Sequence, residues 1–265
     1  MRAGARLTLL SAAIATLAAC ATGPREGPAL YDPHALPTGA VGQSIAYGRA
    51  IVMDTPSVMK GFARAKMSCA ACHLGGGTQP RGGSFAGIYG AFPQWNRRAH
   101  RVIALQDRIA ECFLYSMNGR PPAYESKAMV ALVAYIAWLS RGTPTGRAQS
   151  SDLRYVVPLP SAAPDARRGA LVYAQKCAMC HGAGGEGRAD VFPPLWGPNS
   201  FNSGAGMAHI DRMTGFVRYN MPQNAPGSLS VAQAYDIAAF VLSHPRPRFQ
   251  KNVLVLTPSR PAKYF

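Results

Sequence analysis

The sequence has few charged residues, and very few of them are acidic. Charged residues make up 15% of the 265-residue chain, with 12 Asp and Glu against 28 Lys and Arg, which gives a net charge of +16. Together with 27 Gly and 22 Pro, this excludes a coiled coil or a long helical rod and indicates a loop-rich globular protein. The basic excess favours an anionic partner or substrate. No run of Arg or Lys alternates with aromatic residues, so we expect no nucleic-acid binding.

The N-terminal apolar run is too short to span a membrane. Two arginines precede the 13 largely apolar residues Leu7–Ala19, whereas a spanning helix needs about 20. This pattern predicts a secretory signal peptide over residues 1–19. It ends in Leu-Ala-Ala-Cys20, which resembles the bacterial lipobox, so we expect a lipid anchor at Cys20. The alternative is ordinary cleavage that leaves Cys20 as a free thiol. Because Ala21 follows instead of Asp, the outer membrane is the favoured destination.

Cysteine is scarce, and four of the six cysteines fall into one repeated pattern. This pattern is Cys-x-x-Cys-His, the attachment signature of c-type haem, in which two thiols bond the haem and the adjacent His reaches the iron. A zinc site of four cysteines or a pair of redox dithiols would not require the His. We therefore expect two covalently bound haem c groups. Their residues are Cys69, Cys72 and His73 for haem 1, and Cys177, Cys180 and His181 for haem 2.

The chain repeats itself around the two motifs. Each motif follows a helix-like segment that contains a glycine, Gly48 or Gly169, and precedes a Gly-rich loop and a Phe-Pro pair. Each half closes on an amphipathic helix, over residues 127–139 and 231–242. The candidate strands are limited to residues 153–157 and 253–256. We predict an all-α fold of two cytochrome c-like haem domains, in which a terminal helix crosses the Gly-bearing first helix.

The domain boundaries are predicted from a Pro-rich stretch between the two halves. We expect a signal peptide over 1–19, a lipid-anchored tether over 20–40, a first haem domain over 41–142, a linker over 143–164, a second haem domain over 165–248 and a C-terminal tail over 249–265.

The sixth ligand of haem 2 is predicted from spacing. Met221 lies 40 residues after His181 and precedes a proline, which is the usual distal arrangement of small cytochromes c. Met207 is a rival, and His209 and His244 are further candidates. We predict Met221.

The sixth ligand of haem 1 stays open on spacing alone. The Asp-Arg pairs at 107–108 and 211–212 look like repeat equivalents, and from these anchors Met117 matches Met221. Cys112 is the one cysteine left unexplained, and it lies 39 residues after His73. A thiolate ligand lowers the reduction potential of a haem, whereas a methionine raises it. Cys112 and Met117 are therefore equal candidates that predict different chemistry.

Longer blocks of the sequence resemble the dihaem thiosulfate dehydrogenases. These blocks are residues 67–74, 92–95, 107–113 and 116–119 in the first half, and 193–197, 200–202, 204–207 and 220–222 in the second. The resemblance covers roughly residues 41–248. It implies that haem 1 is catalytic with His73 and Cys112 as ligands, and that haem 2, held by His181 and Met221, passes electrons on. It also implies that Arg98 and Arg108 are active-site arginines.

The implied reaction joins two thiosulfate dianions into tetrathionate. Electrons would pass from haem 1 to haem 2 and on to an external acceptor, such as a small cytochrome c or another periplasmic redox protein. Arginine offsets the repulsion between dianions because it is always charged and bonds oxyanions in a fork. If its segment is helical, Arg108 shares a face with Cys112. The competing functions are a dihaem electron carrier without a substrate, a dihaem peroxidase and a thiosulfate-oxidising subunit coupled to a sulfur carrier.

Overall fold

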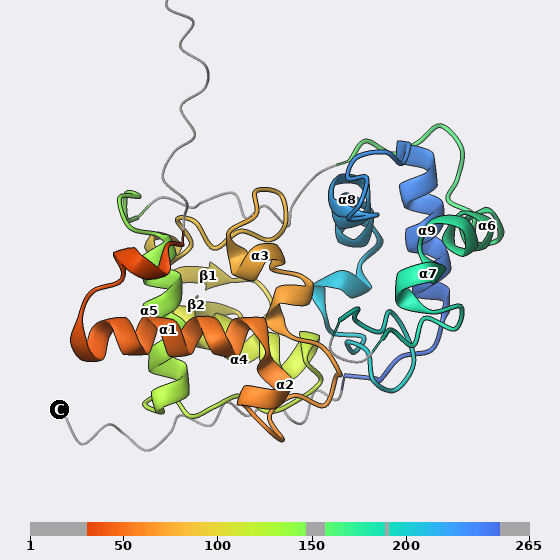
Figure 1. Cartoon of the computed structure of the whole chain (residues 1–265). Coiled ribbons are helices and arrows are strands. Elements are labelled where there is room, and N and C mark those ends of the chain that lie inside the picture. The colour runs from red at the N-terminus through yellow and green to blue at the C-terminus, as the bar shows by residue number, and fades with distance from the viewer. Residues whose placement is uncertain (1–30, 147–156, 189–190, 250–265) are drawn as a thin grey trace, which may run out of the picture.

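The helices fall into two groups that lie side by side (Figure 1). The computed structural model describes residues 31–146, 157–188 and 191–249. The first group contains η1 (Pro33–Ala35), α1 (Gly39–Met53), α2 (Thr55–Val58), η2 (Cys69–Ala71), α3 (Leu74–Gly77), η3 (Tyr89–Ala91), α4 (Leu105–Glu111), the π-helix η4 (Cys112–Ser116) and α5 (Lys127–Leu139). The second contains α6 (Ala166–Lys176), α7 (Ala178–His181), η5 (Gly206–Ala208), α8 (Ile210–Asn220) and α9 (Val231–Ser243). The mostly helical structure confirms the predicted fold class.

Each half is built on a crossed pair of helices, α1 with α5 and α6 with α9. A glycine stands at each crossing. A Cβ atom added to Gly48 would lie 2.0 Å from the carbonyl oxygen of Ala131, and one added to Gly169 would lie 2.0 Å from that of Asp236. Only a residue without a side chain permits such an approach. The predicted crossing of a Gly-bearing first helix by the terminal helix is confirmed in both halves.

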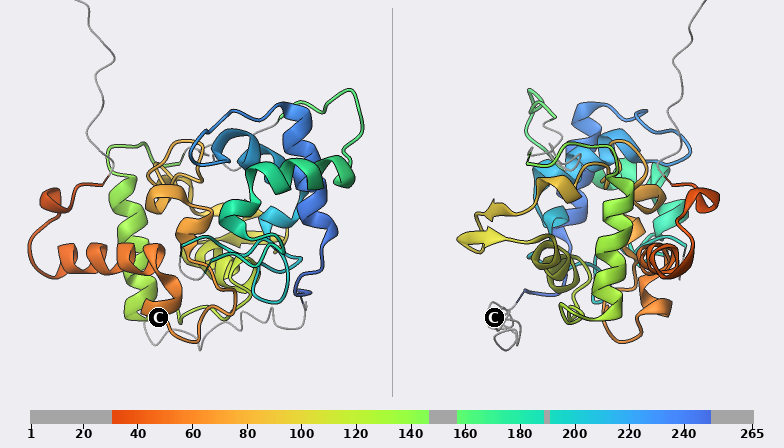
Figure 2. Two further views of the ribbon diagram at one scale, coloured as in Figure 1. Left: turned by 45° about the vertical axis from the view of Figure 1, so that its right-hand side comes forward. Right: turned by 90° about the vertical axis from the view of Figure 1, so that its left-hand side faces the viewer.

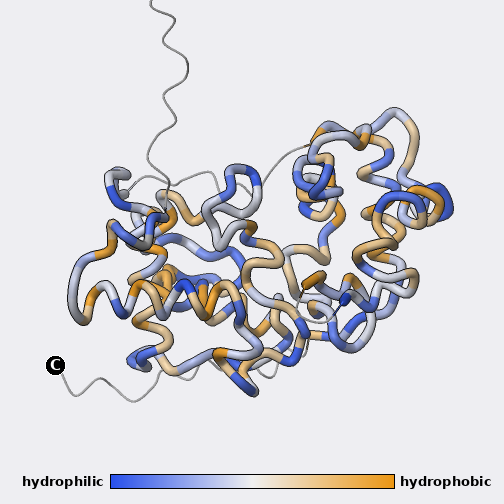
Figure 3. Tube along the Cα trace, viewed as in Figure 1, coloured by the Kyte–Doolittle hydropathy of each residue, from blue (hydrophilic) through white to orange (hydrophobic). Residues whose placement is uncertain are grey.

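The terminal helices begin and end close to the residues that the sequence predicts. α5 spans residues 127–139 as expected, and α9 extends one residue beyond the predicted 231–242. Ser126 and Ser230 cap them, each accepting a hydrogen bond from the backbone N–H three residues on. The trace of α1 contains both hydrophobic and hydrophilic residues (Figure 3). Its buried residues recur every three or four positions, as one covered face of a helix requires: Gly42, Ile45, Gly48, Ile51 and Val52.

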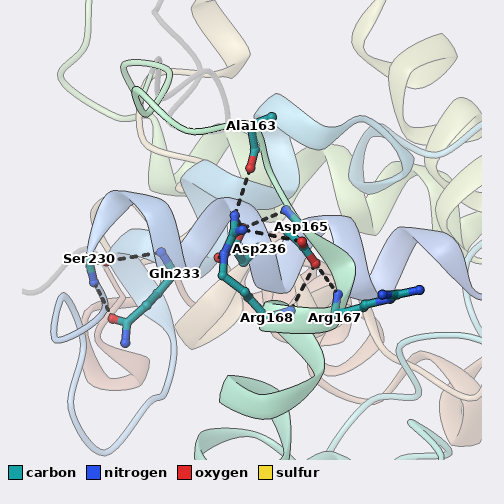
Figure 4. A network of polar contacts seen from close by, with 7 residues as sticks. All are labelled: Ala163, Asp165, Arg167, Arg168, Ser230, Gln233 and Asp236. Carbon is teal, nitrogen blue, oxygen red and sulfur yellow. Dashed lines mark hydrogen bonds and ion pairs between the residues drawn. The ribbon is translucent and has the colours of Figure 1, made fainter.

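A polar clamp ties α6 to α9 in the second half (Figure 4). Arg168 donates from Nε and Nη2 to the two carboxylate oxygens of Asp236, both at 2.8 Å. Asp165 caps the start of α6 by accepting from the backbone N–H groups of Arg167 and Arg168. Asp236 also accepts from the backbone N–H of Asp165 at 2.7 Å, so this buried carboxylate is bonded on both oxygens.

A short hairpin interrupts the first half and corrects the strand prediction. β1 (Gln94–Asn96) pairs antiparallel with β2 (Arg101–Ile103), with Trp95 opposite Val102. The hairpin projects from the helices (Figure 2), and both of those side chains are exposed. Because little of the hairpin is covered, its residues lack the alternation of a half-buried strand, and the strand prediction passed over them. Of the predicted strands, residues 153–156 and 253–256 lie outside the described residues, and Val157 is not in a strand.

Besides a core within the first half, a second hydrophobic core crosses the seam between the halves. Its buried residues include Met67, Leu114 and Tyr115 from the first half with Phe201 and Met213 from the second. A backbone hydrogen bond from the N–H of Lys66 to the carbonyl of Asn199 also joins the halves, at 2.9 Å. The two haem-binding units are therefore packed as one body.

Part of the predicted tether contacts the first half. Tyr31 packs edge-on against Tyr135 of α5 at 5.8 Å between ring centroids, and the guanidinium of Arg49 of α1 lies 4.7 Å from the ring centroid of Tyr31. The predicted signal peptide, Cys20 and the tail beyond Phe249 lie outside the described residues. None of the helices in the described part of the chain is both long enough and apolar enough to cross a membrane.

Candidate functional site

The two Cys-x-x-Cys-His motifs lie at equivalent places in the two halves. Cys69 begins the short helix η2 after α1 and α2, and His73 precedes α3. Cys177 comes directly after α6, and His181 is the last residue of α7. Each motif thus comes after the first long helix of its half, where a turn brings its cysteines and its histidine together.

Each motif histidine is held by a backbone carbonyl. The Nδ1 atom of His73 lies 2.6 Å from the oxygen of Gly83, and that of His181 lies 2.9 Å from the oxygen of Pro193. A carbonyl oxygen can only accept, so both Nδ1 atoms carry the proton and donate. Nε2 then keeps its lone pair for a metal, which is the arrangement typical of metal-bound imidazole. Burial lowers the pKa of His73 to about 4, which favours the neutral, ligating form.

A large cavity opens beside the first motif. Its volume is about 1360 Å³, above the roughly 300–1,000 Å³ typical of small-molecule sites. Cys69, Cys72, His73 and Cys112 all line it. Its walls are largely apolar, and the wall residues include Val52, Phe85, Ile88, Phe92, Leu132 and Ile136. Two thiols, a neutral histidine and an apolar slot of this size fit a covalently attached haem.

Zinc and redox dithiols fit this arrangement less well than haem. Burial raises the pKa of Cys69 to about 11 and that of Cys72 to about 12, whereas a redox dithiol needs a cysteine with a lowered pKa. Within residues 31–146, 157–188 and 191–249, no three His, Cys, Asp or Glu side chains gather as they would around a metal ion.

Cys112 and Met117 lie at opposite ends of one helical turn. Cys112 comes directly after α4 and begins η4, and its side chain is partly exposed towards the cavity. Met117 comes after η4, is only 3% exposed, and packs in the core that crosses the seam. Burial is the main cause of the raised pKa of Cys72, and a charge on the Cys112 sulfur is the second cause. The second cause indicates that the two sulfur atoms are close. Both candidate ligands line the cavity, but Met117 is buried in the core whereas Cys112 is partly exposed.

Arg108 lies one helical turn before Cys112, as the predicted helix requires. The backbone N–H of Cys112 donates to the carbonyl of Arg108, which confirms that the segment is helical. A charge on the Cys112 sulfur is the main cause that raises the pKa of the Arg108 guanidinium; burial opposes it, and the charge of Glu111 adds to it. Arg108 contacts Glu111 at 3.3 Å, and Asn96 of β1 donates to the same carboxylate at 2.9 Å. Glu111 therefore orients Arg108 and also ties α4 to the hairpin.

Arg98 approaches the cavity from the hairpin turn. Its guanidinium lies 4.2 Å from the ring centroid of Tyr115, in a cation–π contact. Both residues line the cavity, so the two predicted arginines face one space although they come from different elements. Arg212 of α8 also lines it, and sequence reasoning missed this contribution from the second half. The sequence held one signal for a role of Arg212, namely that it is the repeat equivalent of Arg108.

Asp107 fixes the start of α4. Its carboxylate accepts from the backbone N–H of Ala104 at 3.0 Å, from Arg101 at 2.8 Å and from the hydroxyl of Tyr124. Burial raises the pKa of Asp107, but the hydrogen bonds from Arg101 and Tyr124 outweigh it and leave the pKa below its usual value. The helix that carries Arg108 and Cys112 is thus anchored at its N-terminal end.

The second half packs its candidate ligands against the core. Met221 comes directly after α8, and both Met221 and Met207 pack against the core together with Cys177 and Leu195. Of the two candidate histidines, His209 precedes α8 and is exposed, whereas His244 stacks on Trp196 at 4.0 Å and donates from Nδ1 to the carbonyl of Phe240. His244 is therefore packed within an aromatic cluster with Trp196 and Phe240. The two methionines remain the better candidates for the sixth ligand of haem 2.

Family models match both halves of the chain. Residues 60–145 match the SoxA/TsdA cytochrome c domain, and residues 164–241 match the family described as cytochrome C oxidase, cbb3-type, subunit III. Each match contains one Cys-x-x-Cys-His motif. These matches support two covalently bound haem c groups, one in each half.

Individual relatives agree over most of the chain. The thiosulfate dehydrogenase of Allochromatium vinosum is 42% identical over 82% of this chain and 83% of its own length. That of Stutzerimonas stutzeri is 40% identical over 80% of this chain and 71% of its own length. A solved structure, thiosulfate dehydrogenase (TsdBA) from Marichromatium purpuratum in its as-isolated form, is 34% identical with a TM-score of 0.77. The match covers 82% of this chain but only 49% of that one, so this chain spans about half of its length. The chain is a dihaem c-type cytochrome and belongs to the thiosulfate dehydrogenase family.

Proposed function

We propose that this protein oxidises thiosulfate to tetrathionate and delivers the electrons to an external acceptor. Two thiosulfate dianions form one S–S bond and release two electrons, and no proton is taken up or lost. The observation that carries the proposal is the cavity that brings together the first haem motif, Cys112 and the arginines Arg98 and Arg108. Family membership supplies the substrate, because the relatives are thiosulfate dehydrogenases.

Each haem c group supplies a one-electron acceptor when bound. His73 and Cys112 are the proposed ligands of haem 1, and His181 and Met221 those of haem 2. The carbonyls of Gly83 and Pro193 fix the two histidines in the ligating tautomer. The anchored helix α4 is followed directly by Cys112, which lines the cavity, while Met221 of the second half packs against the same core as Cys177. A thiolate on one site and a thioether on the other set different potentials, with the lower potential on the haem 1 side.

The arginines bind and orient the anions in this proposal. Two dianions repel one another as their sulfur atoms approach, and guanidinium groups offset this while bonding oxyanions in a fork. Arg108 acts from α4 beside Cys112, and Arg98 acts from the hairpin turn on the same cavity. Glu111 and Tyr115 hold these two side chains in place, which reduces the entropy lost when the substrate binds.

The activity is tested with purified, haem-loaded protein, thiosulfate and ferricyanide. We expect one tetrathionate formed for every two thiosulfate consumed and two ferricyanide reduced. Reduction only with an added sulfur-carrier protein would favour the carrier-coupled subunit, and turnover of peroxide would favour a peroxidase. Stable haem without any of these activities would leave a simple electron carrier.

We also propose that the chain is exported to the periplasm and anchored to the outer membrane through a lipid on Cys20. The predicted signal peptide and lipobox support this, as does the attachment of c-type haem outside the cytoplasm. Cys20→Ala should move the protein from the membrane fraction to the soluble periplasmic fraction with both haems retained. A soluble wild-type protein whose mature N-terminus is another residue would contradict the anchor.

A further inference from the structure

A buried asparagine of the second half reaches across the seam to the helix end that lies beyond Cys112. Asn202 is 1% exposed. Its Nδ2 donates to the carbonyl of Leu114 at 2.8 Å and to Oδ1 of Asn118 at 3.2 Å. Its backbone N–H donates to the carbonyl of Tyr115 at 3.2 Å. Asn202 thus makes two hydrogen bonds to the turn that begins at Cys112, through the carbonyls of Leu114 and Tyr115, and a third to Asn118 just beyond it.

That turn is a π-helix, a rare element that often marks functional sites. The N–H of Met117 donates to the carbonyl of Cys112 at 2.9 Å, and the N–H of Gly119 donates to that of Phe113 at 2.8 Å. The carbonyls of Leu114 and Tyr115 come next, at the helix C-terminus, where partners within the helix run out. Both residues are buried, so water cannot replace the missing bonds cheaply. Asn202 satisfies both carbonyls.

The amide of Asn202 has a single orientation. Its Oδ1 accepts from the backbone N–H of Gly204 at 2.9 Å, while both protons of Nδ2 are used on Leu114 and Asn118. A flipped amide would place its oxygen against the Leu114 carbonyl and its NH₂ against the Gly204 N–H. Every hydrogen-bonding group of the side chain is therefore satisfied in one way only, which makes the contact specific as well as buried.

The loop that carries Asn202 is itself fixed from several directions. The carbonyl of Asn199 accepts from the N–H of Lys66 of the first half at 2.9 Å. The N–H of Ser203 donates to the carbonyl of Pro247 at 2.9 Å, and its hydroxyl accepts from the N–H of Phe249 at 2.9 Å. The ring of Phe249 packs against Tyr115 at 4.7 Å. Asn202 is thus presented by a rigid support rather than by a loose loop.

We propose that Asn202 is a positioning residue of the second half that holds Cys112 in place for haem 1. The inference rests on the proposed role of Cys112 as a haem ligand. The carbonyl of Cys112 accepts the first hydrogen bond of η4, from the N–H of Met117. Because η4 is short, loss of the hydrogen bonds at its C-terminal end would also leave Cys112, at its start, less firmly held. The first half then depends on the second for its ligand set, and not only for accepting its electrons.

The test compares Asn202→Leu and Asn202→Asp with the control Ser203→Ala in the full haem-loaded protein. Leu has a similar volume but no hydrogen bonds, whereas Asp keeps the acceptor for Gly204 and loses the donors to Leu114 and Asn118. Ser203 lies on the same loop, but its side chain contacts the tail instead of η4. Electron paramagnetic resonance reports the ligands of haem 1, and thermal unfolding reports overall stability.

We expect both Asn202 variants to lose most of the low-spin His/thiolate signal of the oxidised protein, while the signal of haem 2 is retained. kcat/KM for thiosulfate should fall about tenfold or more, because a buried carbonyl is left without its donor. Ser203→Ala should keep the wild-type spectrum, because the backbone bonds of Ser203 to Pro247 and of Lys66 to Asn199 still fix the loop. A purely structural role for Asn202 would lower the unfolding temperature and leave the spectrum unchanged.

The outcomes separate this inference from the function on which it rests. A wild-type protein without a His/thiolate signal overturns the assignment of Cys112, and this inference falls with it. A wild-type signal that persists unchanged in the Asn202 variants overturns the inference alone. If Asn202→Leu does not yield haem-loaded protein, the smaller change Asn202→Asp decides in the same way.

Discussion

The two halves share a scaffold and differ in the segment between the haem motif and the terminal helix. Both cross a Gly-bearing helix with a terminal helix, and both fix the motif histidine through a backbone carbonyl. In the first half, the hairpin and α4 place Arg98, Arg108 and Cys112 around a cavity. In the second, the corresponding segment packs its methionines against the core. The comparison indicates that the halves share the crossed helices around the haem motif and differ in the side chains that the intervening segment places there; in the proposed function, those side chains determine what each haem does.

The repeated Asp-Arg pair makes the same difference visible in one detail. Asp107 is buried and bonded to Arg101 and Tyr124, whereas Asp211 is exposed. Arg108 and Arg212 nevertheless line the same cavity, one from each half. Asp211 therefore does not anchor its helix as Asp107 does. Arg212, from the second copy of the pair, lines the cavity beside the first haem motif.

The largest expected effect separates the two sulfur candidates in the first half. Cys112→Ala should lower thiosulfate oxidation by orders of magnitude, because it removes the proposed ligand from the cavity, while haem 2 stays intact. The low-spin His/thiolate resonance of the oxidised protein should disappear with it. Met117→Ala should keep this signal, although it opens a space in the core. The opposite pattern would show that the repeat, which matches Met117 with Met221, is the better guide.

The arginines should come next. Arg108→Gln should cost about 2–4 kcal/mol of transition-state stabilisation, because an oxyanion in a partly desolvated site loses a charged donor. Arg108→Lys should recover only part, since an ammonium group cannot make a planar two-pronged contact. Steady-state kinetics at two ionic strengths check this, and apparent affinity should weaken as salt rises.

Arg248, the residue before the C-terminal tail, provides the control for charge alone. Arg248→Gln removes the same charge as Arg108→Gln, but Arg248 does not line the cavity. We expect nearly wild-type kcat/KM. If Arg98→Gln and Arg108→Gln leave kcat/KM unchanged while Arg248→Gln lowers it, thiosulfate binds elsewhere.

A methionine variant tests the second half. Met221→Ala should remove the weak far-red absorption band of a His/Met haem, because the thioether ligand is lost. Oxidation of thiosulfate with ferricyanide should continue, whereas electron delivery to a protein acceptor should slow. Met207→Ala is the matched control. If only Met207→Ala removes the band, the Gly-rich segment before α8 supplies the ligand.

The shared scaffold is tested by one substitution in each half. Gly48→Ala and Gly169→Ala each force a methyl group to within about 2.0 Å of a carbonyl oxygen, so the helices must separate. We expect a loss of about 1–3 kcal/mol in each case, as for other overpacked cores. Thermal unfolding and haem content measure it. The first half has a core of its own beside Gly48, and a second core joins it to the second half. Because of this shared core, we expect one unfolding transition of the whole protein, which either variant should lower, and two separated transitions would contradict this.

The fold was predictable from the sequence because its signals are local. The haem motifs, the amphipathic helices and the crossing glycines are each recognised from residues a few positions apart. The contributions of Arg212 and Asn202 were not predictable, because they depend on how two distant segments meet across the seam. The hairpin was missed for a different reason: it is held by Asn96, Glu111 and the tight turn rather than by a buried apolar face.

The smallest expected effect contrasts the two aspartates through pH. The pKa of Asp107 in the folded protein lies below its unfolded value of about 3.9, so its ion pair stabilises the fold above that pH. This contribution is lost as the pH falls through the folded pKa, where the carboxylate becomes protonated in both states. Asp107→Asn should therefore lower the unfolding temperature at pH 7, and the difference from wild type should shrink below about pH 4. Asp211→Asn should change the unfolding temperature little, because that side chain is exposed. Equal changes in unfolding temperature for the two substitutions would mean that the aspartate of the repeated Asp-Arg pair has the same role in both halves. The functional difference between the halves would then rest on Cys112 and the arginines alone.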